Sequence, residues 1–255
     1  GGPPGAPAFV LAHGFTNDTS SPSTRRVLLA FARHGAVLAL DFRGHGRSGG
    51  RTSVGRDETM DLDAAIRLAR ARHDRRPVVL VGFSMGGAVA LRQAAIGADR
   101  PDAVVAVSAP SRWYIRHTGP MRRVHWLLEH PIGPLVGRTL GIRLGAPWSQ
   151  VPPTPLELIS RIAPIPVLLV HGTADRYFGV DQARALRRAS GGAAALWMEP
   201  GMGHAESGTS ADLVGRIAAW AASAVGVGSM SDRGDAVRSR DEGGDRAAGE
   251  TKGMR

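Results

Sequence analysis

The stretch that decides the fold is VVLVGFSMGGAVALRQAA, residues 78–95. It opens with an apolar, β-branched run that favours a buried strand, and it passes through GFSMGG at 82–87. Apolar residues then recur at helical spacing, which predicts a helix. Because glycines remove side chains where a strand and a helix pass closely, the pattern favours a sharp turn that exposes Ser84. By itself, the pattern also fits a plain Gly-Ser turn in any α/β protein.

Six continuous apolar runs predict a parallel sheet of about six strands. They cover residues 8–12, 36–42, 77–83, 103–108, 166–170 and 194–198. Since apolar residues fill these runs without alternating with polar ones, each strand is expected to be buried on both faces by helices. Helical patterns separate or follow the runs at residues 23–34, 57–73, 85–97, 181–190 and 209–225. This alternation predicts a doubly wound α/β domain over residues 8–225.

Two segments depart from this alternation. The stretch 110–164 is rich in proline and has no strand pattern, with helical pieces near 121–129 and 134–140. We interpret residues 111–164 as a helical lid inserted into the domain. Residues 226–255 carry many charges and almost no large apolar side chains, so they cannot bury enough surface to offset their ordering entropy. We expect this segment to be a disordered tail.

Composition excludes several classes of protein. The chain of 255 residues is 43% hydrophobic, enough for a sizeable core, and its lack of cysteine excludes disulfides and thiolate chemistry. No apolar run reaches 18 residues, so we expect no integral membrane segment. The net charge of +10 comes almost entirely from arginine, and Lys252 is the only lysine. We attribute this bias to GC-rich codon usage and expect no nucleic-acid partner.

Cofactor and targeting signals are absent from the sequence. No His/Asp cluster has metal-ligand spacing, and no G-x-G-x-x-G follows a strand, so we expect neither a metal nor another cofactor. No signal peptide is visible, which favours a cytoplasmic protein. The chain begins with Gly1 and not with Met, as it would if an upstream segment had been removed. The pattern leaves the oligomeric state open.

Polar residues gather just after the predicted strands. Ligands and catalytic groups in doubly wound sheets lie at the carboxyl ends of the strands. A serine, an aspartate and a histidine stand at such positions, in the order Ser84, Asp175 and His204. A serine hydroxyl is inert at neutral pH and needs a base. The residues between Asp175 and His204 include one predicted helix and one predicted strand, the length that brings two adjacent strand ends together.

Five short pieces together resemble the α/β-hydrolase superfamily, over roughly residues 8–225. They are HGF (13–15), DFRGHGRS (41–48), GFSMGG (82–87), HGTAD (171–175) and GMGH (201–204). The resemblance implies a catalytic triad with Ser84 as nucleophile, His204 as general base and Asp175 as the carboxylate that orients the histidine. A turn or cap role for Asp175 and a structural loop role for His204 are the alternatives.

The resemblance also implies an oxyanion hole and a substrate pocket. The backbone N–H groups of Phe15 and Met85 would form the oxyanion hole, although Phe15 also suits the core as an aromatic residue. The candidate pocket residues are His13, Gly14, Trp113, Tyr114 and Trp126. The histidines His13, His45 and His171 also fit purely structural roles, because they stand beside glycines at strand ends or in the loop after the second strand.

The chain departs from the family pattern before residue 8. The family usually has two strands ahead of the one that ends in HGF, and only residues 1–7 stand there. We therefore expect the first two family strands to be missing and the sheet to be entirely parallel.

The lid combines aromatic residues with seven arginines, which fits an apolar roof with a cationic rim for acyl esters. The alternatives are a packed lid with a solvated arginine face, which an arginine-rich chain favours, and a lipid-binding surface.

The function predicted from these residues is that of a serine hydrolase. We expect a small-molecule acyl substrate, a carboxylic ester with a small or medium acyl chain, cleaved through an acyl-enzyme. Family members that open epoxides or displace halide use aspartate at the position of Ser84, which disfavours those activities. Peptide, thioester or lactone hydrolysis, acyl transfer and cofactor-free peroxidase activity remain open. A non-catalytic binder that keeps the fold is a further alternative.

Overall fold

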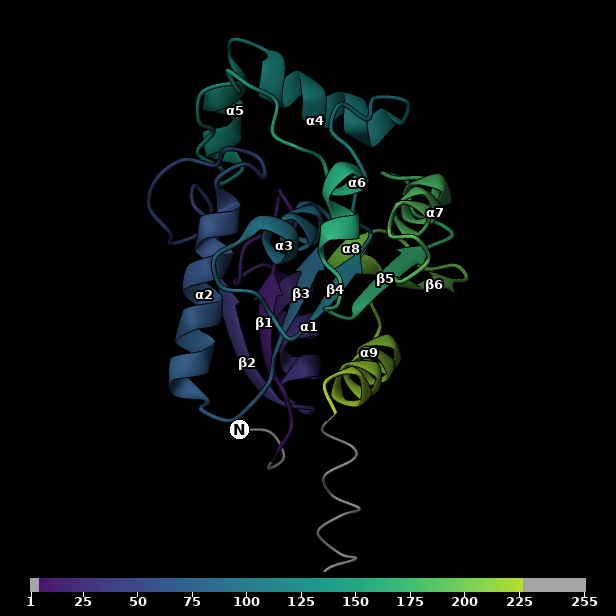
Figure 1. The fold of residues 1–255 in the computed structure, drawn as a ribbon. Coiled ribbons are helices and arrows are strands. Elements are labelled where there is room, and N and C mark those ends of the chain that lie inside the picture. The colour runs from purple at the N-terminus through teal and green to yellow at the C-terminus, as the bar shows by residue number, and fades with distance from the viewer. Residues whose placement is uncertain (1–4, 227–255) are drawn as a thin grey trace, which may run out of the picture.

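The computed structural model describes residues 5–226 and contains one six-stranded sheet (Figure 1). The strand order is β2-β1-β3-β4-β5-β6, and every neighbouring pair is parallel. The strands are β1 (Ala8–Ala12), β2 (Ala36–Leu40), β3 (Val78–Phe83), β4 (Ala103–Val107), β5 (Val167–Gly172) and β6 (Ala195–Glu199). The predicted parallel α/β sheet is confirmed, and the described part of the chain adds no antiparallel strand to it.

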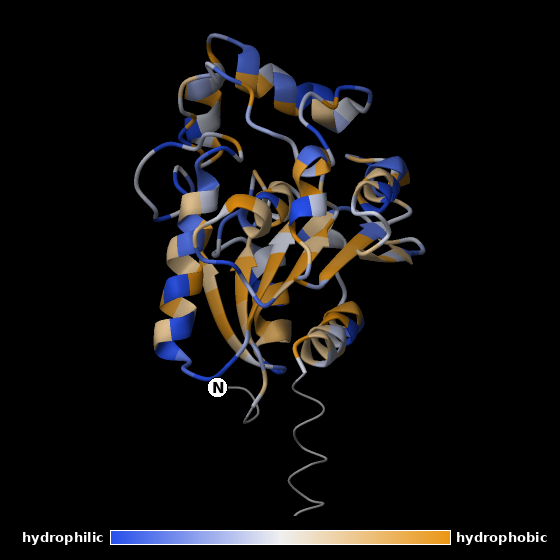
Figure 2. Cartoon of the chain, in the orientation of Figure 1, coloured by the Kyte–Doolittle hydropathy of each residue, from blue (hydrophilic) through white to orange (hydrophobic). Residues whose placement is uncertain are grey.

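Helices cover both faces of the sheet. Those with side chains in one buried cluster are α2 (Glu58–Arg72), α3 (Met85–Ile96) and α7 (Val180–Ala189). Those in the cluster on the opposite face are α1 (Pro22–Phe31) and α9 (Ala211–Ala224). Figure 2 shows the strands between them as a largely hydrophobic layer. The arrangement is that of a doubly wound domain.

The continuous apolar runs are explained by burial on two sides. In β1, Val10 and Ala12 belong to the cluster under α2 and α3, whereas Phe9 and Leu11 belong to the cluster under α1 and α9. All five residues of β1 are buried. A strand in this position has no solvent face, and therefore its sequence shows no polar alternation.

The segment between β4 and β5 carries the helices α4 (Gly119–Glu129) and α5 (Gly133–Thr139), close to their predicted positions. Figure 1 shows both beyond the carboxyl ends of the strands. Three further elements have only three or four residues, too few for a periodic pattern. They are α6 (Pro155–Leu158), η1 (Ile159–Arg161) and α8 (Ala205–Gly208). A capping box between Thr154 and Glu157 marks the start of α6.

Backbone hydrogen bonds tie the predicted lid to the loop after β2. The N–H of Arg143 donates to the carbonyl of Gly44, and the N–H of Thr52 donates to the carbonyl of Arg143, both at 2.8 Å. The predicted tail, 226–255, lies outside the described residues except for Gly226. Among residues 5–226, no helix has both the length and the apolar content needed to cross a membrane.

The start of α3 lies against the end of β1, where the chain order of the strands reverses. A Cβ on Gly86 would lie 2.4 Å from the carbonyl oxygen of Ala12, and a Cβ on Gly82 would lie 2.2 Å from the carbonyl oxygen of Gly86. Both distances are to backbone atoms and are shorter than any van der Waals contact. Only glycine at these positions lets the strand, the turn and the helix pack this closely.

We predict that Gly86→Ala lowers the free energy of unfolding by at least about 2 kcal/mol, because the new methyl group overlaps a fixed carbonyl. Gly215→Ala in α9 is the matched control, since its Cβ would meet nothing nearer than 3.7 Å. The control should be neutral or more stable by up to about 1 kcal/mol. Urea denaturation of both variants checks this, and equal midpoints would contradict the close-contact explanation.

Candidate active site

Ser84 stands in the turn between β3 and α3 with an unusual backbone conformation. Its φ is 52° and its ψ is −117°, a region that residues other than glycine rarely adopt. The turn is held because the N–H of Ser84 donates to the carbonyl of Val107 at 2.9 Å, in the neighbouring strand. Backbone strain of this kind is typical of a serine presented at a strand-to-helix turn.

His204 connects Ser84 to Asp175. The Nε2 of His204 lies 2.9 Å from the Oγ of Ser84, and its Nδ1 lies 2.7 Å from the Oδ2 of Asp175. Asp175 follows β5 and His204 precedes α8, so the three side chains come from separate loops at one edge of the sheet. The structure therefore brings together the three residues expected from the sequence, in the order required for proton transfer.

The Asp175 carboxylate is buried and fully hydrogen-bonded. Its Oδ1 accepts the N–H groups of Tyr177 at 2.8 Å and Phe178 at 3.1 Å. Burial raises the pKa of Asp175, but the hydrogen bond and charge of His204 and the two N–H donors together lower it by more. The pKa of Asp175 is therefore below its usual value. Asp175 is therefore ionised at neutral pH and accepts the Nδ1–H of His204.

Two aromatic residues that the sequence analysis did not single out enclose His204. The ring of Tyr177 stacks on the imidazole with centroids 4.3 Å apart, and Phe178 contacts it edge-on at 5.4 Å. They stand two and three residues after Asp175 in the chain, and this proximity was the only signal available. Their packing restricts the ring of His204 to the plane in which it contacts both neighbours.

Two backbone N–H groups next to Ser84 have no acceptor among residues 5–226. They belong to Phe15 and Met85, the expected oxyanion-hole donors. Gly14, the residue before Phe15, lies beside Ser84, because a Cβ there would be 3.4 Å from the Cβ of Ser84. The N–H of Met85 also stands at the start of α3, where the helix dipole favours negative charge. The position suits an oxyanion.

Buried histidines hold the turn that contains Phe15. The Nε2 of His13 accepts the N–H of Phe42 at 3.0 Å, so its Nδ1 carries the proton and donates to the carbonyl of Gly14 at 2.7 Å. The Nε2 of His45 lies 2.7 Å from the carbonyl oxygen of Phe15. Burial lowers the pKa of His13 to about 4, and therefore its ring is neutral above that pH.

A cavity of about 350 Å³ opens over Ser84. Of the expected pocket residues, Gly14, Trp113 and Tyr114 line it, whereas His13 and Trp126 do not. His13 is buried beneath the turn, and Trp126 is 46% exposed and stacks on His130. Of the seven lid arginines, Arg112 alone lines the cavity, so most of the predicted cationic rim points elsewhere.

Glu206 is a further cavity residue that the sequence analysis missed. Its side chain is 1% exposed, and its Oε1 accepts the N–H of Gly14 at 2.7 Å. The Oε2 lies 3.3 Å from the point where a Cβ on Gly14 would stand, next to Ser84. It comes two residues after His204, and only this proximity could have drawn attention to it. In residues 5–226, no cluster of side chains suits a metal ion.

Known proteins share this sequence pattern and this fold. A family model described as Hydrolase_4, serine aminopeptidase, S33, matches residues 4–140. The uncharacterized protein YqkD of Bacillus subtilis (strain 168) is 30% identical over 204 residues, which are 79% of this chain. The match covers 66% of YqkD, so the chain spans just under two thirds of that relative's length.

Solved structures of esterases have a similar fold. One from Pyrococcus furiosus is 22% identical, with a TM-score of 0.63 over 83% of this chain and 81% of its own. One from Rhodococcus sp. ECU1013 is 21% identical, with a TM-score of 0.63 over 86% of this chain and 91% of its own. At this level of identity, the likeness establishes the fold.

We predict a loss of stability in acid that depends on His13. The unfolded chain binds a proton near pH 6.5 and the folded chain near pH 4, so stability falls as the pH drops through this window, by up to roughly 3 kcal/mol. Above pH 6.5 the effect is absent. Urea midpoints from pH 7.5 to 4 should fall less steeply in His13→Gln than in the wild type. Parallel curves for the two proteins would contradict the prediction.

Proposed function

The chain belongs to the α/β-hydrolase family described as serine aminopeptidase, S33, and within it we propose a serine hydrolase that cleaves a carboxylic ester. The observation that carries the proposal is the hydrogen-bonded series from Ser84 through His204 to Asp175. A lone serine has no base within reach, whereas this one has a base whose second nitrogen is fixed by an ionised carboxylate.

The proposed reaction has two stages. The Oγ of Ser84 attacks the ester carbonyl while His204 takes its proton, and His204 then returns that proton to the departing alcohol. The N–H groups of Phe15 and Met85 would stabilise the oxyanion that forms in each stage. In the second stage, a water molecule that gives its proton to His204 attacks the acyl-enzyme ester. The acid is released, and His204 returns the proton to the Oγ of Ser84. Asp175 keeps the imidazole in the productive tautomer throughout.

The cavity chemistry supports an apolar acyl group. Its volume of about 350 Å³ lies at the small end for ligand pockets. The lid side is lined mostly by apolar and aromatic residues, among them Ile115, Met121, Trp113, Tyr114 and Trp148, with Arg112, His125 and Glu129 as polar exceptions. Such a lining favours transfer of hydrocarbon from water, and the volume suits a short or medium acyl chain.

We predict that Ser84→Ala lowers the turnover of p-nitrophenyl butyrate by roughly a thousandfold or more, since the nucleophile is lost. The fold should persist, because the Ser84 hydroxyl makes no hydrogen bond in residues 5–226 other than that to His204. Ester assays and thermal denaturation measure the two effects. Wild-type protein should react with a fluorophosphonate probe, and Ser84→Ala should not. Retained activity in the variant, or an unreactive wild type as expected of a non-catalytic binder, would contradict the proposal.

A second candidate is hydrolysis of an aminoacyl or peptide bond. The observation that favours it is the Glu206 carboxylate, which lines the cavity beside Ser84 without a cationic partner in the described chain. A buried carboxylate attracts an ammonium group. The amino group of a substrate with a free N-terminus would satisfy it. The family description as serine aminopeptidase is in line with this candidate.

Glu206→Gln separates the two candidates. The amide oxygen can still accept the N–H of Gly14, but the negative charge is gone. If an ammonium group binds here, kcat/KM for leucine p-nitroanilide should fall at least tenfold relative to p-nitrophenyl butyrate, as expected for a lost charge-assisted hydrogen bond. An equal change for both substrates, or no cleavage of the anilide by wild-type protein, would leave the ester as the substrate class.

A further inference from the structure

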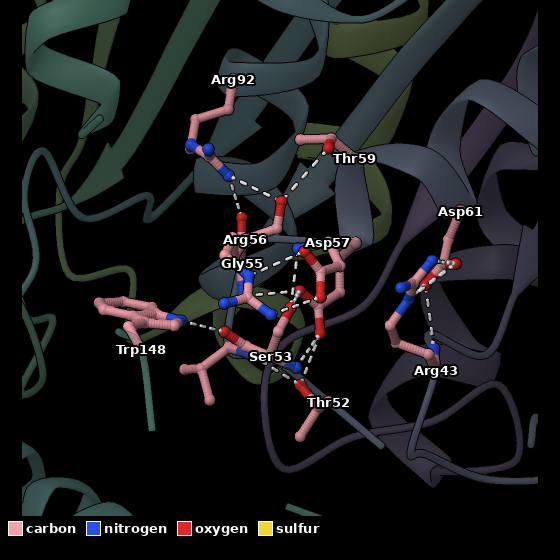
Figure 3. Close-up of polar contacts among 12 residues, drawn as sticks. Arg43, Thr52, Ser53, Gly55, Arg56, Asp57, Thr59, Asp61, Arg92 and Trp148 are labelled. Carbon is pink, nitrogen blue, oxygen red and sulfur yellow. Dashed lines mark hydrogen bonds and ion pairs between the residues drawn. The ribbon is translucent and has the colours of Figure 1, made fainter. Parts of the chain in front are cut away.

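Donors of the turn Thr52–Gly55 surround the carboxylate of Glu58. Figure 3 shows Thr52, Ser53 and Gly55 of this turn. Oε1 accepts the hydroxyl of Thr52 at 2.7 Å and the N–H of Ser53 at 2.8 Å. Oε2 accepts the hydroxyl of Ser53 at 2.8 Å and the N–H of Gly55 at 2.7 Å. Glu58 is completely buried at the first position of α2. One carboxylate thus receives four donors from one turn.

This carboxylate has no ion-pair partner in the described chain, although a cation lies nearby. The buried guanidinium of Arg92, on α3, donates to the carbonyls of Gly55, Arg56 and Pro153, not to Glu58. The negative charge is stabilised by the four donors, by the start of α2 and by the charge of the nearby Arg92. Glu58 and Arg92 therefore both bind the same turn, Glu58 through the donors of Thr52, Ser53 and Gly55, and Arg92 through the carbonyl of Gly55.

The turn held in this way is a wall of the cavity above Ser84. Thr52, Ser53 and Val54 all line that cavity. Val54 has a φ of 54°, which is rare for a β-branched residue and has to be held by its surroundings. Its neighbours on both sides, Ser53 and Gly55, donate their N–H groups to Glu58. The position of Val54 thus depends on a carboxylate that does not itself line the cavity.

The same turn also supports two lid aromatics. The Nε1 of Trp148 donates to the carbonyl of Ser53 at 2.6 Å. Trp113 lies over Gly55, where a Cβ would be 3.1 Å from its ring, and contacts Trp148 edge-on at 5.4 Å. Both tryptophans line the cavity. A shift of this turn would move the wall and this part of the roof together.

We propose that Glu58 is a positioning residue that sets which acyl chains the enzyme accepts. It acts through Val54 and the two tryptophans, and it does not touch the substrate. The inference rests on the proposed function, because it takes the cavity above Ser84 as the acyl site. It predicts that the turn governs KM and chain-length preference, whereas a merely structural role would reduce the activity toward all esters alike.

The experiment compares Glu58→Gln and Val54→Ala with the wild type on p-nitrophenyl acetate, butyrate and octanoate. Glutamine has one acceptor oxygen in place of two, so at least two of the four donors lose their partner. Val54→Ala leaves Glu58 and its hydrogen bonds intact but shortens the side chain with which residue 54 lines the cavity. We expect the octanoate-to-acetate ratio of kcat/KM to change at least fivefold in both variants, mainly through KM. Asp74→Asn, at an exposed carboxylate beyond the far end of α2, should change the ratio less than twofold.

Three outcomes decide the proposal. An unchanged ratio in folded Glu58→Gln overturns it, and so does an equal loss on all three esters, which would indicate a structural role only. If Glu58→Gln does not fold, Val54→Ala decides alone, and an unchanged ratio there overturns the proposal. Wild-type protein that neither hydrolyses the esters nor reacts with a fluorophosphonate would instead overturn the proposed function itself.

Discussion

The close contact between the start of α3 and the end of β1 is the constraint on which the site depends. Glycines at 82 and 86 let backbone pass against backbone where side chains would overlap carbonyl oxygens. Ser84 is thereby placed at the point where the strand order reverses, between the carboxyl ends of β1 and β3. Phe15 and Met85, whose N–H groups we propose as oxyanion donors, line the same cavity as Ser84. Without this contact, the fold would not bring Ser84 together with the residues that surround it.

Loops at this edge of the sheet are organised around buried acceptors. Asp175 accepts two backbone N–H groups from the turn that follows it, Glu206 accepts the N–H of Gly14, and Glu58 accepts donors from the turn before α2. A buried carboxylate is costly unless it is hydrogen-bonded, and a buried loop amide is costly unless it finds an acceptor. Each arrangement satisfies both requirements, and each fixes one boundary of the cavity.

The predicted lid combines a tethered part with an apolar interior. Residues near Arg143 and Trp148 are bound to the loop after β2, whereas the inner side of α4 contributes Met121, Val124 and Leu128 to the cavity. Polar contacts therefore hold the lid in place, and apolar side chains give the cavity its chemistry. This division explains why most lid arginines do not line the cavity.

Local sequence patterns determined much of the protein. The apolar runs, helical spacings and glycines predicted the parallel sheet and its main helices to within a few residues. The positions of Ser84, Asp175 and His204 after predicted strands, together with the resemblance to α/β-hydrolases, predicted which side chains the structure brings together. These inferences succeed because strand and helix periods, and the carboxyl-end rule for parallel sheets, are properties of neighbouring residues and of topology.

Tertiary structure decided the rest. The contact between Gly14 and Glu206 joins residues that are 192 positions apart, and no sequence pattern around either residue predicts it. The burial of Glu58 and the outward position of Trp126 likewise depend on how the lid and loops pack. Sequence therefore specified which residues carry the proposed chemistry. Only long-range packing decided which side chains shape the cavity, because that depends on surfaces that meet after folding.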